Sequence, residues 1–132
     1  EIDDDGTIHC QEAFLGGDTG EIVDPAGVRC QLEGGFLQSL SWSLGEEVLY
    51  DKEGIQSQDW DTYKLLTYRQ IPKIKTILLD RPGMPFLGCG EAMQGPTVAA
   101  VANAVSNVIG VRLRATPFTS ERVQSAAWDS GS

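Results

Sequence analysis

The strongest constraint on the fold is a helical pattern that runs from Asp24 to Gly45. Asp24 is a favourable N-cap, Pro25 suits the first position of a helix, and Gly45 is a suitable end. Between these limits, apolar residues recur at helical spacing, namely Val28, Leu32, Phe36, Leu40 and Leu44. We therefore predict one long helix with an apolar face directed to the core.

Two adjacent glycines, Gly34 and Gly35, lie inside this helix. Each costs about 1 kcal/mol relative to alanine in a helix interior. One explanation is that another backbone or a flat ligand comes against the helix, where Gln31 offers an amide that donates and accepts hydrogen bonds. The other is tight packing on a sheet. The spacing alone leaves both open.

The remaining elements alternate between the two classes of secondary structure. We predict strands in residues 6–17, 46–54, 73–80 and 111–116, and a second helix from Pro96 to Gly110. Residues 55–72 are polar and aromatic, and form a long connection. The order predicts an α+β fold, an antiparallel sheet with two helices packed on one face in the split βαβ (ferredoxin-like) arrangement.

The length of 132 residues suits one domain, which we assign to residues 1–123. Residues 124–132 form a polar tail that we expect to be disordered. The chain opens without a methionine, so we expect a piece of a longer protein.

The net charge of −9 argues against nucleic acid or an anionic membrane as a partner. Arg112, Arg114 and Arg122 form either a local anion site or a solvated strand edge. No apolar run approaches the roughly 18 residues that span a bilayer. We expect a cytoplasmic location, or a periplasmic one if the chain is exported with a partner.

The few thiols and imidazoles exclude several classes of site. Three cysteines without a CxxC pair and the single His9 predict no metal site, and His9 has no triad partners around it. Cys89 is either a reactive thiol or a small buried side chain.

The segment "GCGEAMQGPT", residues 88–97, contains the one motif that indicates a catalytic or ligand-binding site. Gly88 and Gly90 let backbone approach a ligand, and the helix that follows Glu91 would favour an anion at its N-terminus. The third glycine of a dinucleotide fingerprint and the lysine of a P-loop are both missing. Glu91 is therefore either an ordinary solvated carboxylate or a general base aimed at a ligand.

Three segments together give the chain a family resemblance. "GEIVDPAGVRCQLEGGFLQSLSWSLGEEV", "DTYKLLTYRQIPKI" and "GCGEAMQGPTVAAVANAVSNVIGVRLRATPFTSERV" resemble the C-terminal end of the molybdopterin-binding large subunit of the xanthine dehydrogenase and aldehyde oxidase family. The likeness covers residues 6–123. Within this family, the chain is most similar to the bacterial branch that acts on aldehydes or N-heteroaromatic compounds such as isoquinoline and nicotinate.

The resemblance implies roles for particular residues. Glu91, presented by Gly88 and Gly90, would be the active-site base beside molybdenum. Gln31 would contact the pterin cofactor, with Gly34 and Gly35 giving it room. The segment Asp61 to Tyr63 matches a recurring family segment, and we interpret its tyrosine as structural. Ala92, Met93 and Gln94 replace the continuation with proline that many members have, which leaves the substrate open.

The resemblance also implies missing parts. Family members use molybdopterin, for which a cytosine dinucleotide form is one alternative, and we expect none in the isolated chain. The partners would be the remaining molybdenum-binding portion, an iron-sulfur subunit or domain, and a small aldehyde or heteroaromatic substrate. Alone, the chain would be inactive and could form a homo-dimer. The alternative is a free-standing binding or oligomerisation module without redox activity.

Overall fold

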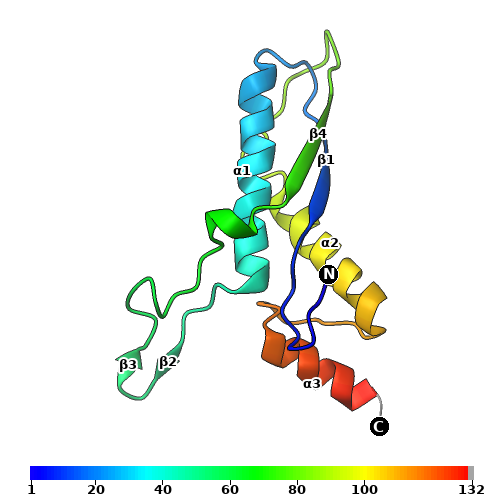
Figure 1. The fold of residues 1–132 in the computed structure, drawn as a ribbon. Coiled ribbons are helices and arrows are strands. Elements are labelled where there is room, and N and C mark those ends of the chain that lie inside the picture. The colour runs from blue at the N-terminus through cyan, green and yellow to red at the C-terminus, as the bar shows by residue number, and fades with distance from the viewer. Residues whose placement is uncertain (131–132) are drawn as a thin grey trace.

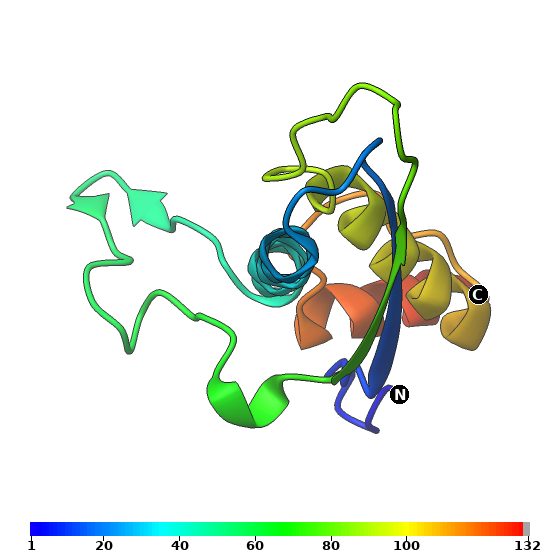
Figure 2. The ribbon, with the colours of Figure 1, turned by 90° about the horizontal axis from the view of Figure 1, so that it is seen from above.

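Helix α1, Pro25–Leu44, is the central element around which the other elements are arranged (Figure 1). The structure is a computed structural model that describes residues 1–130. Viewed along its axis, α1 has the sheet on one side, α2 beside it and a long arm of residues 46–72 projecting on the opposite side (Figure 2). The fold is α+β, as predicted.

The predicted first helix is confirmed, together with its predicted N-cap and C-terminal end. The Asp24 carboxylate accepts a hydrogen bond from the Ala26 amide at 3.1 Å, and the Gly45 amide donates to the Ser41 carbonyl at 3.0 Å. The predicted apolar stripe reaches the core, which consists of Leu15, Leu32, Phe36, Leu40 and Met93. A helix buried on several sides explains why small residues such as Ser39 and Ser43 are fully buried on it as well.

The main sheet has two parallel strands, β1 (Glu12–Asp18) and β4 (Lys73–Leu79), paired from Glu12 opposite Lys73 to Asp18 opposite Leu79. Buried Leu15 and Gly17 of β1 face α1. A Cβ on Gly17 would lie 2.4 Å from a Leu32 methyl carbon, so only glycine permits this approach of sheet and helix.

The predicted antiparallel sheet is wrong for this pair, and the split βαβ order is not confirmed. The predicted strand in residues 46–54 does not enter the sheet, because the chain turns back between Asp51 and Gly54. It forms only a small antiparallel hairpin, β2 (Tyr50–Asp51) and β3 (Gly54–Ile55), at the end of the arm (Figure 1). Because α1 and the arm both lie between β1 and β4 in sequence, the connection is long enough for a parallel crossover.

The last predicted strand, residues 111–116, is also wrong. Its alternation is real, since Val111 and Leu113 are half-buried while Arg112 and Arg114 are exposed. Within residues 1–130, however, no strand lies beside this segment to complete a ladder. An alternating pattern indicates that one face of a segment is buried. A loop that lies against the core shows the same pattern as a strand.

Part of the predicted disordered tail is helical. Helix α3, Ser120–Ser130, crosses the boundary placed after residue 123, and Val123 is buried. Residues 131 and 132 of that predicted tail lie outside the described residues. The second predicted helix is confirmed as α2, Gln94–Ile109, which Gly110 ends in a left-handed conformation at φ 75°.

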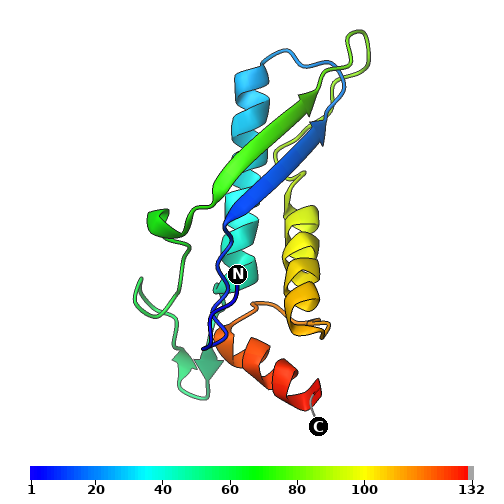
Figure 3. The same ribbon diagram turned by 45° about the vertical axis from the view of Figure 1, so that its right-hand side comes forward.

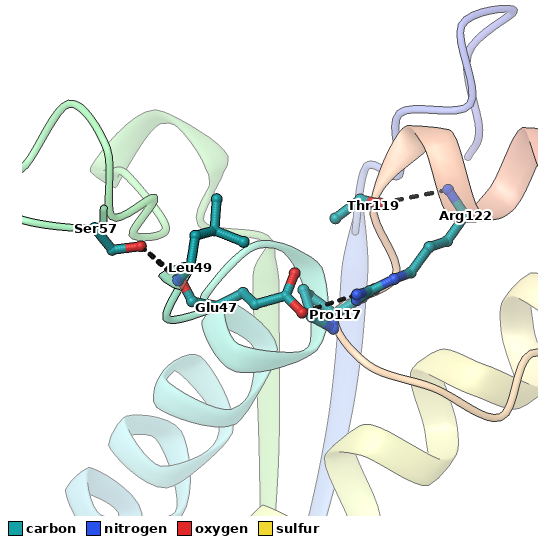
Figure 4. A network of polar contacts seen from close by, with 6 residues as sticks. All are labelled: Glu47, Leu49, Ser57, Pro117, Thr119 and Arg122. Carbon is teal, nitrogen blue, oxygen red and sulfur yellow. Dashed lines mark hydrogen bonds and ion pairs between the residues drawn. The ribbon is translucent and has the colours of Figure 1, made fainter. Parts of the chain in front are cut away.

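Polar contacts connect α3 to the start of the arm and stabilise the arm itself, just beyond the end of α1. The Arg122 guanidinium donates to the Glu47 carboxylate and the Pro117 carbonyl, both at 2.8 Å, and Ser57 in the arm accepts from the Leu49 amide (Figure 4). The Tyr63 hydroxyl donates to Glu46 at 2.8 Å, and this bond raises the pKa of the phenol. Tyr63 is thus in a structural position.

In the part of the chain that the structure describes, no helix has both the length and the apolar character needed to traverse a bilayer.

An ion pair at the end of the sheet predicts an acid-sensitive contribution to stability. Arg81 contacts the Asp18 carboxylate at 2.8 Å, and this hydrogen-bonded pair lowers the pKa of Asp18. A depressed folded-state pKa stabilises the protein above the unfolded pKa, and the benefit is lost as pH falls through the folded value. We expect Asp18→Asn to destabilise the chain at pH 7 but not well below pH ~4, the usual aspartate pKa.

Urea denaturation at a series of pH values measures this effect, with Arg81→Gln and the double variant completing a mutant cycle. The two single changes should be non-additive at pH 7 and additive at the acid end. Equal coupling throughout the pH range would contradict the assignment.

Candidate functional site

The turn that carries Glu91 lies directly against α1. A Cβ placed on Gly35 would be 3.5 Å from the Gly90 carbonyl oxygen and 3.6 Å from the Met93 Cβ. A Cβ placed on Gly90 would in turn be 3.6 Å from the Gln31 side-chain oxygen. The two motifs, about 60 residues apart in the sequence, therefore form one surface.

The turn is anchored on its C-terminal side by the start of α2. Met93 is buried against the core formed by Leu32 and Phe36. The Met93 carbonyl accepts from both the Thr97 amide at 3.0 Å and the Thr97 hydroxyl at 2.5 Å, and Thr97 is itself buried. The amide of Gln94 donates to the Glu91 carbonyl at 3.2 Å, so the glutamate backbone is held within the first turn before the helix.

A loop contact anchors the turn on its N-terminal side, and sequence reasoning missed it. The Leu87 amide donates to the Thr19 carbonyl at 2.8 Å, and the Arg81 amide donates to the Gly20 carbonyl at 3.1 Å. Gly20 has φ +78°, and a Cβ there would lie 2.0 Å from the Pro85 carbonyl oxygen. Only glycine fits, and the "DTG" turn signal at residues 18–20 could have indicated this position.

The structure brings the predicted site residues to one place. Gln31, Gly35 and Gly90 are in contact, Gly34 adjoins them on α1, and Gly88 and Glu91 flank Gly90. All except Gly35 are exposed. Glu91 is thus exposed to solvent on this chain, and we call the surface formed by these six residues the wall.

The glycines of this wall differ in what they accommodate. A Cβ on Gly34 or Gly88 would meet no atom within 4 Å, and neither residue has a positive φ. Neither local packing nor backbone conformation therefore demands glycine at these two positions. Gly35 is different, since the Glu91 turn rather than the sheet lies against it. The space outside Gly34 and Gly88 is open on this chain.

Glu33, between Gln31 and Gly34, faces away from the wall. Its carboxylate accepts from the Thr76 hydroxyl at 2.7 Å, and the neighbouring Arg29 donates to the Thr76 carbonyl at 2.9 Å. These bonds connect α1 to β4. They fix the rotation of the helix about its axis and therefore the direction in which Gln31 and the glycines point.

The other candidates from the sequence do not join the site. Arg112 donates to Asn103 and Arg122 is paired with Glu47, so the arginines do not gather into one anion site. Cys89 is half-buried against the core, in agreement with a small packed side chain. Burial raises the pKa of the Cys10 thiol, which lies two residues before the start of β1. Among residues 1–130, no group of three or more potential ligands from His, Cys, Asp and Glu is placed to hold a metal ion.

Residues 1–72 match the family model described as "Molybdopterin cofactor-binding domain". The chain belongs to this family of molybdenum hydroxylase domains. Gln31 to Gly35 lie inside the matched range, whereas Gly88 to Glu91 lie beyond it.

Individual relatives extend the likeness along the chain. It is 36% identical to a subunit of nicotinate dehydrogenase of Pseudomonas putida over 96% of this chain and 11% of that protein. It is 34% identical to the membrane-bound aldehyde dehydrogenase (pyrroloquinoline-quinone) of Gluconacetobacter polyoxogenes, over 85% of this chain and 14% of the relative. Among solved structures, quinoline 2-oxidoreductase from Pseudomonas putida 86 superposes with a TM-score of 0.87 at 27% identity, over 97% of this chain and 17% of that one. The chain thus spans between about a tenth and a sixth of the length of these relatives.

The glycine pair gives a direct test of the local geometry. Gly34→Ala should raise the free energy of unfolding by about 1 kcal/mol, because alanine is the better helix former and the space is open. Gly35→Leu should lower it by about 1–3 kcal/mol, because the longer side chain must displace the Glu91 turn.

Chemical denaturation of the chain measures both changes, and Gly35→Ala serves as the matched control because its Cβ fits at ordinary contact distance. A stabilising Gly35→Leu would show that the turn does not pack on α1 as described.

Proposed function

We propose that this chain forms one wall of a molybdenum hydroxylase active site, with Glu91 as the catalytic base and Gln31 as a cofactor contact. Gly34, Gly88 and Gly90 provide the surface against which the cofactor lies, and the buried Gly35 contributes by letting the Glu91 turn cross α1. The observation that carries the proposal is the crossing of the Glu91 turn over α1 at Gly35, with open space outside Gly34 and Gly88.

The residues present fit a flat polar cofactor such as molybdopterin. Side chains at Gly34 and Gly88 would fill space that the packing of this chain leaves free. Beside them, the exposed Gln31 amide can both donate to and accept from a pterin edge. When bound, the cofactor supplies the two-electron oxidation of an electron-poor carbon, with water as the source of oxygen.

Glu91 supplies the proton acceptor. Its backbone is fixed by α2 and by the contact of Gly90 with Gln31, so the carboxylate is presented from a rigid support. A base works best when its pKa approaches the working pH, which requires water to be excluded. The exposed Glu91 of this chain lacks that cover, so the remaining part of the subunit must provide it. We therefore propose that the chain alone is inactive.

The substrate class follows from the relatives' names and is a proposal for this chain. Two names specify N-heteroaromatic compounds, nicotinate and quinoline, and one specifies an aldehyde. We propose an aldehyde or N-heteroaromatic substrate and a separate iron-sulfur subunit or domain as electron acceptor, in the cytoplasm or in the periplasm after export with a partner. The cytosine dinucleotide form of the pterin is one alternative. Analysis of the complete subunit for molybdenum and pterin would distinguish a molybdenum hydroxylase, which contains both, from an enzyme that uses pyrroloquinoline quinone.

A second candidate is a binding or oligomerisation module without redox activity. The arm favours it, because Tyr50, Trp60 and Tyr68 expose large apolar surfaces, Trp60 to 81%. Such a module would form a homo-dimer through these side chains. Size-exclusion chromatography of Trp60→Ser beside the unchanged chain tests for this dimer, and a monomeric unchanged chain would argue against the module.

The base is tested with Glu91→Gln in the complete subunit. The amide keeps the shape of the side chain but cannot take up a proton at neutral pH, so we expect unchanged molybdenum and pterin content. Hydroxylation should fall by about a hundredfold or more, in line with general-base catalysis. Turnover at the normal rate would overturn the assignment of Glu91.

The cofactor contact is tested with Gln31→Leu, for which Gln38→Leu is the matched control. Gln38 is exposed on the same helix and lies two turns further along the same stripe, beyond the crossing at Gly35. We expect Gln31→Leu to lower pterin occupancy of the purified subunit severalfold, while Gln38→Leu retains it. Equal occupancy in both variants would argue against the contact.

A further inference from the structure

Strand β1 has a neighbour on one edge only. Among the described residues it pairs with β4 and with no other strand. α1 covers one face of this pair, while the other exposes Phe14 to 66% and Ile77 to 62%, and a Cβ on Gly16 would meet open space. Parallel sheets are normally covered on both faces, and a pair of strands alone is only marginally stable. The sheet is therefore incomplete.

The free edge presents an ordered row of backbone groups. The Lys73 amide donates to the Gln11 carbonyl at 3.1 Å, which sets the direction of the groups along β1. Because both backbone groups of a strand residue point to the same side and successive residues alternate, Ala13, Leu15 and Gly17 face β4. Phe14, Gly16 and Asp18 direct their amides and carbonyls to the opposite edge.

A groove of about 580 Å³ runs along this edge between β1 and α2. Figure 3 shows β1 with β4 on one side and α2 on the other. α2 lines the groove with small residues at every fourth position, namely Pro96, Ala100 and Ala104, and Ala92 in the preceding turn continues this row. A neighbouring strand lies about 4.8 Å away in a sheet, and small side chains leave the helix far enough back to admit it.

The charges at the ends of β1 are already neutralised within the chain. Lys75 contacts Glu12 at 3.0 Å and Arg81 contacts Asp18 at 2.8 Å. The rest of the groove lining is uncharged and mostly apolar, with Leu15, Met93 and Val101 among its residues, and Thr19 and Thr97 are polar members of it. Its chemistry thus suits an uncharged, apolar segment in extended conformation.

We propose that the free edge of β1 receives such a segment as the next strand of the sheet, and that this strand comes from the remainder of the molybdenum-binding subunit. This rests on the proposed function, under which the chain is one part of that subunit. The relatives contain several times more chain than the part that matches here, which supplies a source for the strand. Backbone pairing would fix the position of the Glu91 wall relative to the rest of the site.

The test is made in the complete subunit with Ala100→Leu, which puts a larger side chain into the groove. Ala99→Leu is the matched control, because Ala99 is the next residue on α2, is exposed and does not line the groove. Hydrogen exchange resolved to single amides is the measurement, with molybdenum content determined in parallel.

In the unchanged subunit, the amides of Phe14, Gly16 and Asp18 should be protected together with those of Ala13, Leu15 and Gly17. Ala100→Leu should accelerate the first set by about a hundredfold and leave the second set protected, since only the first set bonds to the incoming strand. Ala99→Leu should change neither set.

Three outcomes would overturn the proposal. These are rapid exchange of the first set in the unchanged subunit, equal effects of the two leucine variants, and protection that rises with protein concentration and so indicates a second copy at the edge. Failure of the proposed function is distinguishable, because it would appear as an unchanged subunit that contains no molybdenum and pterin whatever the exchange pattern.

Discussion

The contact between α1 and the turn at Gly90 is the interaction on which the rest of the site depends. It brings together a helix face and a loop that have no sequence proximity, and it requires that Gly35 carry no side chain longer than a methyl group. Met93 anchors the same turn in the core, and Thr97 fixes its carbonyl. A carboxylate on such a support keeps a fixed direction toward a bound ligand, whereas a carboxylate on a free loop does not.

The remaining contacts orient α1 correctly for this crossing. Gly17 lets the sheet approach Leu32, and Glu33 and Arg29 attach the helix to Thr76 of β4. At the other end of α1, the pair of Arg122 with Glu47 connects α3 to the start of the arm (Figure 4). The helix is therefore held along its length, and its glycine-bearing face stays open to the outside.

Several features of the molecule agree with the proposal that the chain is one part of a larger subunit. The sheet has a bare face and a free edge, the arm exposes Trp60 and Tyr68, and Glu91 lacks the cover that a catalytic base needs. Membership of the molybdopterin-binding family, together with the much greater length of the relatives, gives these features one common origin. Under the proposed function, the exposed surfaces are contact surfaces within a larger subunit.

The sequence by itself determined the elements whose signals are local. These signals act within a few residues, and they are the cap at Asp24, the apolar stripe of α1 and the stop at Gly110. The motifs around Gln31 and Glu91 indicated the protein family. Strand pairing is different, because it depends on which segments meet in space. The sheet is parallel and residues 111–116 form no strand. In addition, α3 extends into the tail that the sequence predicts to be disordered. Only the tertiary structure decided that Gly35 receives the Glu91 turn while Gly34 remains open, since the same residue type serves close packing at one position and free space at the next.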